Sequence, residues 1–232
     1  MGSEMCIRDR HPTEPKPNAT GEWSPFEWPV GPSEPCAAPW PGADRLFADV
    51  AWSRRSAVGE SIGLGPAGNL LHHLTKDADD RLVGRAGIPV HRRITPSAGG
   101  LHPYSFLCIG DEDRRALLYD PATHAFMPMA VSHHDLYGLN HREVSEILGS
   151  APGVTVRVMI DAAKVSAAYR DPETLILRDA GAILSVAGML AEWLDLLACP
   201  LGFMGGAFLN VIGLPSERLI GAGGFQLSAK QA

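Results

Sequence analysis

The triplet Arg54-Arg55-Ser56 places two guanidinium groups beside a hydroxyl. A guanidinium group binds phosphate oxygens through paired N–H donors, and a serine hydroxyl supplies one donor more. The triplet therefore suits a phosphate dianion. The alternative is the solvated basic end of a helix.

Two turns that contain glycine are further candidates for ligand binding. The first, Pro96-Ser97-Ala98-Gly99-Gly100, leads into the apolar run 104–109, and the second lies at 199–206. Backbone N–H groups are open to a ligand where no bulky side chain intervenes, so a flat cofactor ring can lie against such a turn. The alternative is a tight loop whose glycines serve only to reach positive φ.

Three other motifs are incomplete. Residues 63–68 have the G-x-G-x-x-G spacing of a dinucleotide-binding loop, but no apolar strand precedes them. His133, His134 and His141 lack the spacing of a metal-binding helix and have no cysteine nearby, so we predict no metal site. No G-x-S-x-G elbow is present for serine hydrolysis.

Composition excludes several classes of protein. Hydrophobic residues make up 45% and charged residues 20% of the 232 residues, which is ordinary for a soluble domain. The formal charge is -6 and no run of Lys or Arg exceeds two residues, so we predict no nucleic-acid partner. The widely spaced cysteines Cys6, Cys36, Cys108 and Cys199 favour reduced thiols and a cytoplasmic location.

The segment 180–191 is the longest candidate for a membrane span. It holds 12 uncharged residues between Asp179 and Glu192, fewer than the roughly 20 that cross a bilayer. We therefore predict a buried helix and no membrane partner.

Periodicity and turn residues predict the elements that must position these motifs. Residues 1–43 form a Pro/Trp-rich arm whose first ten residues we set aside as not native, and 44–232 form one domain. The aromatic residues of the arm either anchor it across a partner subunit or belong to a loose linker. Helices are predicted at 42–54, from Pro66 to the acidic patch 77–80, and at 135–148, 172–197 and 207–212. Strands are predicted at 104–109, 116–119, 154–160 and 219–227.

Two of these elements carry more specific expectations. The helix 172–197 has apolar residues around most of its circumference, so we expect it to lie centrally or between subunits, with Asp171 as its N-cap. The strand 154–160 alternates apolar and polar residues, so we expect one of its faces to meet the core. We expect the glycines at 221, 223 and 224 to interrupt the last strand.

The order of these motifs resembles that of the nitroreductase superfamily of flavin enzymes, and most closely its SagB-type branch of azoline dehydrogenases, which act on ribosomally made thiazole/oxazole peptides. The resemblance covers roughly residues 51–227. It implies an α+β fold with a mostly antiparallel central sheet sandwiched by helices. It also implies an isologous homodimer with FMN at the subunit interface.

The resemblance implies a cofactor site that is built from three stretches of the chain and from one residue near the end of the sequence. The residues are Arg54, Arg55, Ser56, Pro96, Ser97, Gly99, Gly100, Pro200, Leu201, Gly202 and Lys230. Arginine and serine hold the phosphate and ribityl chain, while the Pro-Ser-Ala-Gly-Gly turn approaches the flavin ring from the neighbouring subunit. The backbone N–H of Gly202 points at the reactive part of the flavin. Val58 stands where the family has a basic residue, and the family's terminal arginine is missing.

Tyr169 is the second catalytic candidate that the resemblance implies, beside Gly202. Tyr169-Arg170 is similar to the position of a Lys-Tyr pair in the peptide dehydrogenases, but Ala168 replaces the lysine. Tyr169 then serves as an acid or hydrogen-bonding group. Lys164, one helical turn earlier, can substitute for the lysine only if this segment is helical.

The implied function is an FMN-dependent oxidoreductase that works by ping-pong hydride transfer through the flavin. Its donor is NAD(P)H or a peptide azoline, and its substrate is a small molecule or a peptide. A different class remains open, because Val58, Ala168 and the missing arginine all weaken the family pattern. That alternative is a flavin-free, degenerate member which acts as a scaffold or leader-peptide binder in a biosynthetic complex.

Overall fold

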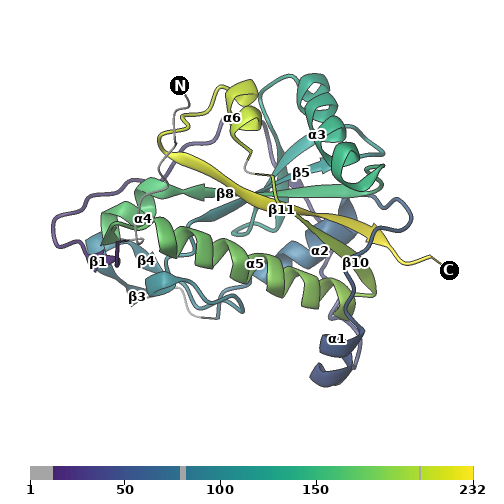
Figure 1. Cartoon of the computed structure of the whole chain (residues 1–232), viewed down its shortest axis with the longest axis horizontal. Coiled ribbons are helices and arrows are strands. Elements are labelled where there is room, and N and C mark those ends of the chain that lie inside the picture. Colours follow the sequence, from purple (N-terminus) through teal and green to yellow (C-terminus); the bar gives the residue numbers. More distant parts are fainter. Residues whose placement is uncertain (1–12, 79–81, 204, 232) are drawn as a thin grey trace, which may run out of the picture.

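The computed structural model describes residues 13–78, 82–203 and 205–231. The first ten residues and Cys6 lie outside the described residues. The fold is built around a seven-stranded antiparallel sheet with the strand order β10-β11-β8-β5-β6-β7-β2 (Figure 1). These strands are β2 Glu34–Pro35, β5 Tyr104–Gly110, β6 Ala116–Asp120, β7 Ala125–Pro128, β8 Val154–Asp161, β10 Leu196–Leu201 and β11 Leu219–Ala229.

Helices cover both faces of this sheet. Helices α2 and α5 lie on one face, and α3 and α6 lie on the other (Figure 1). The helices are α1 Phe47–Ser53, α2 Leu64–Thr75, α3 His133–Leu148, α4 Ala162–Ala168, α5 Glu173–Trp193 and α6 Gly206–Ile212. Two small two-stranded sheets complete the fold, β1 Lys16–Pro17 with β9 Tyr169–Arg170 and β3 Leu82–Val83 with β4 Pro89–Val90. The expected antiparallel sheet between helices is confirmed.

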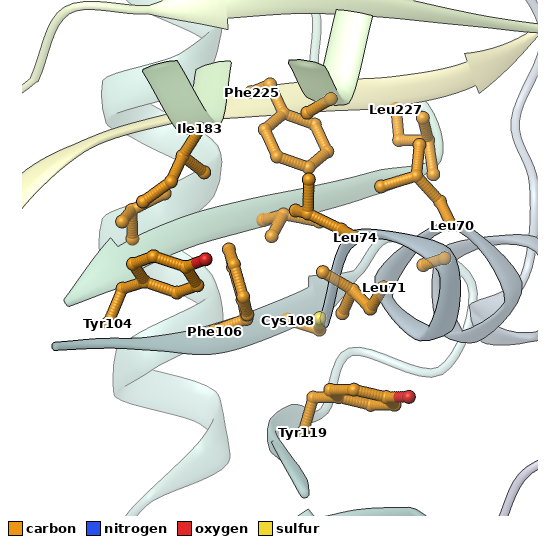
Figure 2. Close-up of a cluster of buried hydrophobic side chains, with 14 of the residues drawn as sticks. Leu70, Leu71, Leu74, Tyr104, Phe106, Cys108, Tyr119, Ile183, Phe225 and Leu227 are labelled. Carbon is orange, nitrogen blue, oxygen red and sulfur yellow. The ribbon is translucent and has the colours of Figure 1, made fainter. Parts of the chain in front are cut away.

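The larger core fixes α2 and α5 against the sheet. Leu74 of α2 lies between Phe106 of β5 and Phe225 of β11, while Leu70 of α2 and Ile183 of α5 lie to either side of them (Figure 2). All five side chains are buried. Burial of each such side chain contributes about 1.5 to 3 kcal/mol, so α5 has one defined position across the sheet.

The strand β8 differs from its expected half-buried form. Residues 154–160 are buried on both faces, although the pattern predicted one core face. The reason is that β8 pairs with β5 and β11 on its two sides while helices cover both faces of the sheet. A fully enclosed strand must satisfy its polar side chains internally, and Thr155 accordingly donates to Gln226 Oε1 over 2.6 Å.

The end of α5 was predicted wrongly. The helix ends at Trp193, and residues 196–201, which we assigned to the helix and a glycine turn, form the edge strand β10 paired with β11. Asp195 has a φ of +60° at the reversal between helix and strand. Proline cannot donate to a sheet ladder, but an edge strand tolerates Pro200. Asp171 is also not the N-cap, because Pro172 takes that position without a side-chain hydrogen bond.

Two smaller differences concern α1 and β11, while α2 agrees with the expectation from the sequence. Helix α1 is only 7 residues long, and Leu46 and Phe47 of its predicted apolar stripe are 73% and 77% exposed. Helix α2 does not directly follow a strand of the sheet, and the sheet is antiparallel, which agrees with setting aside a dinucleotide-binding loop at residues 63–68. Strand β11 continues through its glycines, with a bulge between Gly221 and Gly224.

By length and composition alone, helix α5 is long and apolar enough to cross a membrane. In this fold it crosses the central sheet, and Ile183, Ala187 and Leu190 are buried in the core. The interpretation of this segment as a buried helix therefore agrees with the structure.

The described part of the N-terminal arm packs on the chain's own domain. Its strand β2 pairs with β7 at one edge of the central sheet, and β1 pairs with β9. Trp23 Nε1 donates to Asp161 Oδ2 over 2.9 Å. Trp28 packs on the core between the sheet and helices α3 and α6. The arm thus belongs to the same layered structure as the rest of the chain.

Candidate functional site

Arg54 and Ser56 line one cavity with the C-terminal half of α5. The cavity has a volume of about 340 Å³, and its lining residues are Arg54, Ser56, Leu184, Ser185, Gly188, Met189 and Pro200. Arg54 Nη1 donates to Ser56 Oγ over 3.2 Å, so the guanidinium and the hydroxyl lie at the same point of the wall. The structure therefore brings together Arg54, Ser56 and Pro200 from distant parts of the sequence.

Gly188 of α5 makes room for Arg54. A Cβ atom at residue 188 would lie 3.2 Å from Arg54 Cδ, which is tighter than nearly all real contacts. Arg55 turns elsewhere, because its Nη1 donates to the carbonyl oxygens of Trp52 and Arg54 over 2.7 and 2.9 Å. Arg55 thereby caps the end of α1 and is not a lining residue of the cavity.

Pro200, Leu201 and Gly202 lie where β10 ends. Pro200 is exposed and reaches the cavity, Leu201 is buried, and Gly202 follows the strand with no neighbour near the place of a Cβ atom. The next residue, Phe203, stacks on the buried guanidinium of Arg157, with 4.0 Å between Cζ and the ring centroid. This stacking holds the chain directly after Gly202.

The Pro-Ser-Ala-Gly-Gly turn is fixed to the other end of α5 by one buried carboxylate. Ser97 Oγ donates to Asp179 Oδ2 over 2.5 Å, and the Ala98 N–H donates to Oδ1 over 3.1 Å. Burial raises the pKa of Asp179, and the two hydrogen bonds lower it in part. The turn itself is closed by a hydrogen bond from the Gly100 N–H to the Ser97 carbonyl, while Pro96 is exposed beside it.

Gly99 makes room for the hydroxyl of Tyr169. Its φ is +60°, and a Cβ atom there would lie 2.7 Å from Tyr169 Oη. These two residues, together with Gly84, Arg85, Leu101 and Ala168, line a second cavity of about 170 Å³. The Arg85 guanidinium lies 4.9 Å from the centroid of the Tyr169 ring. The predicted catalytic tyrosine is therefore next to the glycine turn and not next to Arg54.

The predicted site thus forms two groups along α5. Asp179, which holds the turn, and Gly188, which lies against Arg54, are separated by nine residues. At 1.5 Å per residue that is about 14 Å along the helix axis. Within one chain, the two groups do not meet.

The two lysines considered from the sequence have other surroundings. Lys164 lies on α4, so its segment is helical, but it lines a different cavity from Tyr169. Lys230 Nζ lies 3.2 Å from Glu192 Oε1 and 2.9 Å from Asp195 Oδ1. Lys230 is therefore paired with carboxylates at the end of α5 and is not a lining residue of the Arg54 cavity.

A buried chain of hydroxyl and imidazole groups supports the turn from the other side. His102 Nε2 lies 3.0 Å from the His91 carbonyl, which can only accept, so Nε2 carries the proton. Its Nδ1 then accepts from Tyr104 Oη over 2.7 Å, and Tyr104 in turn accepts from Thr95 Oγ1 over 2.5 Å. Burial, with a smaller contribution from Arg93, lowers the pKa of His102 to about 4.

Asp179, Gly188 and His102 were not selected from the sequence as site residues. A carboxylate inside an apolar helix is a usable signal, because such a group must find buried donors. Gly188 offers no comparable signal, since glycine is needed there only because the Arg54 side chain packs against that position in the folded chain. Among residues 13–78, 82–203 and 205–231, no group of three or more His, Cys, Asp or Glu side chains is arranged to hold a metal ion.

No protein-family model matches this chain, and neither does any curated protein sequence. Solved structures do match. A protein assigned as a nitroreductase from Ralstonia eutropha JMP134 aligns with 95% of this chain and 100% of its own, with a TM-score of 0.67 and 15% identity. A protein of the same assignment from Desulfovibrio desulfuricans, in complex with FMN, covers 82% of this chain and 89% of its own, with a TM-score of 0.52 and 19% identity.

The Escherichia coli microcin synthetase McbBCD complex, with truncated pro-MccB17 bound, also contains a similar chain. The match covers 83% of this chain and 76% of that one, with a TM-score of 0.58 and 16% identity. These likenesses show that the chain has a nitroreductase-like fold. The α+β architecture expected from the resemblance is therefore confirmed.

Asp179→Ala should destabilise the protein by about 2 to 3 kcal/mol, because the Ser97 hydroxyl and the Ala98 N–H lose a charged acceptor in a buried place. Arg178→Ala, at the exposed neighbouring position, should change stability by no more than about 0.5 kcal/mol. Urea unfolding of both variants measures the difference. Equal effects would show that the carboxylate does not hold the turn.

Acid should destabilise the folded protein through His102. Its folded pKa of about 4 lies below the usual 6.5, so its contribution is present above pH 6.5 and is lost as the pH falls through 4. The full shift corresponds to about 3 kcal/mol. In His102→Gln, unfolding free energies measured from pH 7 to pH 3.5 should decrease by that much less than in the wild type. Parallel curves would contradict the assignment.

Proposed function

We propose that this chain is an FMN-dependent oxidoreductase. The observation that carries the proposal is that Arg54, Ser56 and Pro200 line one cavity against α5 in a nitroreductase-like fold. FMN supplies the hydride chemistry when it is bound, and the protein supplies binding and orientation. The similar Desulfovibrio structure in complex with FMN supports the choice of cofactor.

The residues present fit the phosphate end of FMN. The Arg54 guanidinium and the Ser56 hydroxyl provide donors on one wall, and the absence of a side chain at Gly188 leaves space for that guanidinium. A cavity of about 340 Å³ lies within the range of small-molecule sites. Gly202, which follows Pro200 and Leu201 at the end of β10, would offer its backbone N–H to the flavin ring, as the resemblance implies.

We propose further that a second copy completes the site. The Ser97 turn and Tyr169 lie about 14 Å along α5 from the Arg54 cavity, so one chain cannot present both groups to one ring. Antiparallel contact of α5 with its copy around a twofold axis brings each turn to the partner's cavity. Exposed Leu177 at 61%, with exposed Gly181 and Ser185 on the same helix, supports close contact there.

The substrate that we propose is a small electron acceptor or a peptide, with NAD(P)H as a possible donor and the cytoplasm as the location. The similarity to a chain of the microcin synthetase complex supports the peptide class. Ala168 is buried beside Tyr169, so the lysine of the peptide dehydrogenases has no counterpart in that cavity. Tyr169 therefore acts as the hydrogen-bonding group next to the turn.

One observation favours the second candidate, a flavin-free scaffold or leader-peptide binder. Lys230, expected at the phosphate, is paired with Glu192 and Asp195, so Arg54 is the only cation among the lining residues. A visible absorbance spectrum of the purified protein separates the candidates. Bound-flavin peaks support the oxidoreductase, whereas a colourless protein that FMN cannot reconstitute supports the scaffold.

Arg54→Ala should weaken FMN binding about 10- to 100-fold, which corresponds to the loss of one charged hydrogen-bonding group. Arg55→Ala is the matched control, because Arg55 is exposed and bonds to backbone carbonyls instead. Fluorescence titration of FMN measures both dissociation constants. If the control lost as much affinity as Arg54→Ala, the cavity would not be the phosphate site.

Leu177→Glu should convert the proposed dimer into a monomer, because it brings two like charges together at the twofold contact only when two copies meet on α5. Ile147→Glu is the control, since Ile147 is 54% exposed on α3, which covers the opposite face of the sheet. Sedimentation velocity gives the oligomeric state. A wild type that sediments as a monomer, or a Leu177→Glu variant that stays dimeric, would contradict the proposed interface.

A further inference from the structure

A small cavity lies beneath the N-terminal arm, apart from the groups described above. Its volume is about 140 Å³, and its lining residues are Trp23, Pro25, Phe26, Trp28, His102, Pro103, Tyr104, Ser105, Asp161, Lys164 and Leu219. It shares no lining residue with the Arg54 cavity or with the Tyr169 cavity. Trp23, Phe26 and Trp28 come from the arm, whereas the polar residues come from the segment that leads into β5, the start of β5, the end of β8 and α4.

Lys164 is the unusual member of this cavity. The residue is only 9% exposed, and its ammonium lies 5.1 Å from the centroid of the Trp23 ring. Within the described part of the chain its Nζ makes no hydrogen bond or ion pair. A buried ammonium without an anionic partner is costly, so this group is suited to an anion from outside the chain.

Asp161 makes no ion pair with Lys164, although its charge favours the ammonium form. Its carboxylate accepts from the Trp23 indole over 2.9 Å, from Arg218 Nη2 over 3.2 Å and from the backbone N–H of Lys164 over 3.2 Å. The negative charge is therefore already paired with the Arg218 guanidinium. The ammonium of Lys164 keeps its three donors for another acceptor.

The remaining groups around the cavity are neutral or positive. Arg93 raises the positive potential at both His102 and Lys164, and His102 is neutral because its pKa is about 4. Tyr104 stays protonated, since burial raises the pKa of its hydroxyl. The buried Nε atoms of Arg93 and Arg218 also have no hydrogen-bond partner among the described residues. The surroundings thus hold an excess of positive charge.

We propose that this cavity binds a short-chain monocarboxylate, with its carboxylate on Lys164 and its alkyl tail against the aromatic residues of the arm. One unpaired ammonium matches a single negative charge better than a phosphate dianion. The volume equals that of four or five water molecules at about 30 Å³ each, which admits acetate to butyrate and excludes a nucleotide. Trp23, Phe26 and Trp28 provide apolar walls that a bare inorganic ion would leave unused.

The test is a calorimetric titration of the purified chain with sodium butyrate at pH 7. Saturable binding is expected, and Lys164→Met should weaken it at least tenfold. Lys76→Met is the control, because Lys76 is exposed at the end of α2 and is not a lining residue of this cavity. Trp23→Leu should also weaken butyrate more than acetate, since it removes the wall that contacts the tail.

The pH dependence gives a second readout that does not depend on a variant. Burial, followed by the charge of Arg93, lowers the pKa of Lys164 to about 8, while Asp161 opposes the shift. Butyrate remains ionised above pH 6, so its affinity should stay level to about pH 8 and then fall toward tenfold per pH unit as the ammonium loses its proton. A bound carboxylate raises the pKa of the ammonium in the complex, so the affinity starts to fall at the pKa of the free protein and levels off only above the pKa of the complex.

The proposal would be overturned by a lack of saturable butyrate binding, by equal affinity in Lys164→Met, or by affinity that does not fall at high pH. Sulfate that binds while butyrate does not would also overturn it, because the site would then select charge alone. Neither experiment involves flavin, so their results are independent of whether the chain is an oxidoreductase.

Discussion

The buried carboxylate of Asp179 is the interaction on which the candidate site depends. It lies inside an apolar helix, where an unpaired charge is costly, and it accepts from the Ser97 hydroxyl and the Ala98 N–H. Burial of the Asp179 carboxylate therefore constrains the backbone of the Pro-Ser-Ala-Gly-Gly turn, because the turn must stay in the position where it donates these two hydrogen bonds. The Pro-Ser-Ala-Gly-Gly turn also holds Gly99 against the hydroxyl of Tyr169.

Helix α5 extends this constraint across the molecule. Its core residues fix it to the sheet, so the distance between Asp179 and Gly188 does not change with the surface loops. One end carries the turn and the other accommodates Arg54. A ligand that needs both a phosphate seat and a flat backbone surface cannot find them in one chain at this separation. This geometry is why we connect the proposed cofactor with a proposed second copy.

The sequence predicted the layers of the fold because these depend on apolar periodicity and on turn residues. The helices 135–148 and 207–212 and the strands 104–109 and 116–119 agree with α3, α6, β5 and β6 within two residues. The predictions failed where long-range pairing decides the outcome. Residues 196–201 have no local strand signal of their own, and they form β10 only because β11 offers an edge. Phe47 is apolar yet exposed, because none of the described elements covers it.

The site was predictable to the extent that single motifs carry chemistry. Arg54 and Ser56 lie together, as their residue types indicated. Arg55 instead bonds to the backbone, and Lys230 pairs with carboxylates. These two contacts depend on neighbouring residues that lie outside the motifs. Lys164 illustrates the same limit. Its position one turn before Ala168 made it a substitute for the missing lysine, yet it lines a cavity of its own beneath the arm. The spacing of residues along a helix determines the face on which a side chain lies. The segments packed on that face determine which groups the side chain contacts. For Lys164 those segments are the aromatic arm and the Arg218–Asp161 pair, which together leave its charge for a ligand.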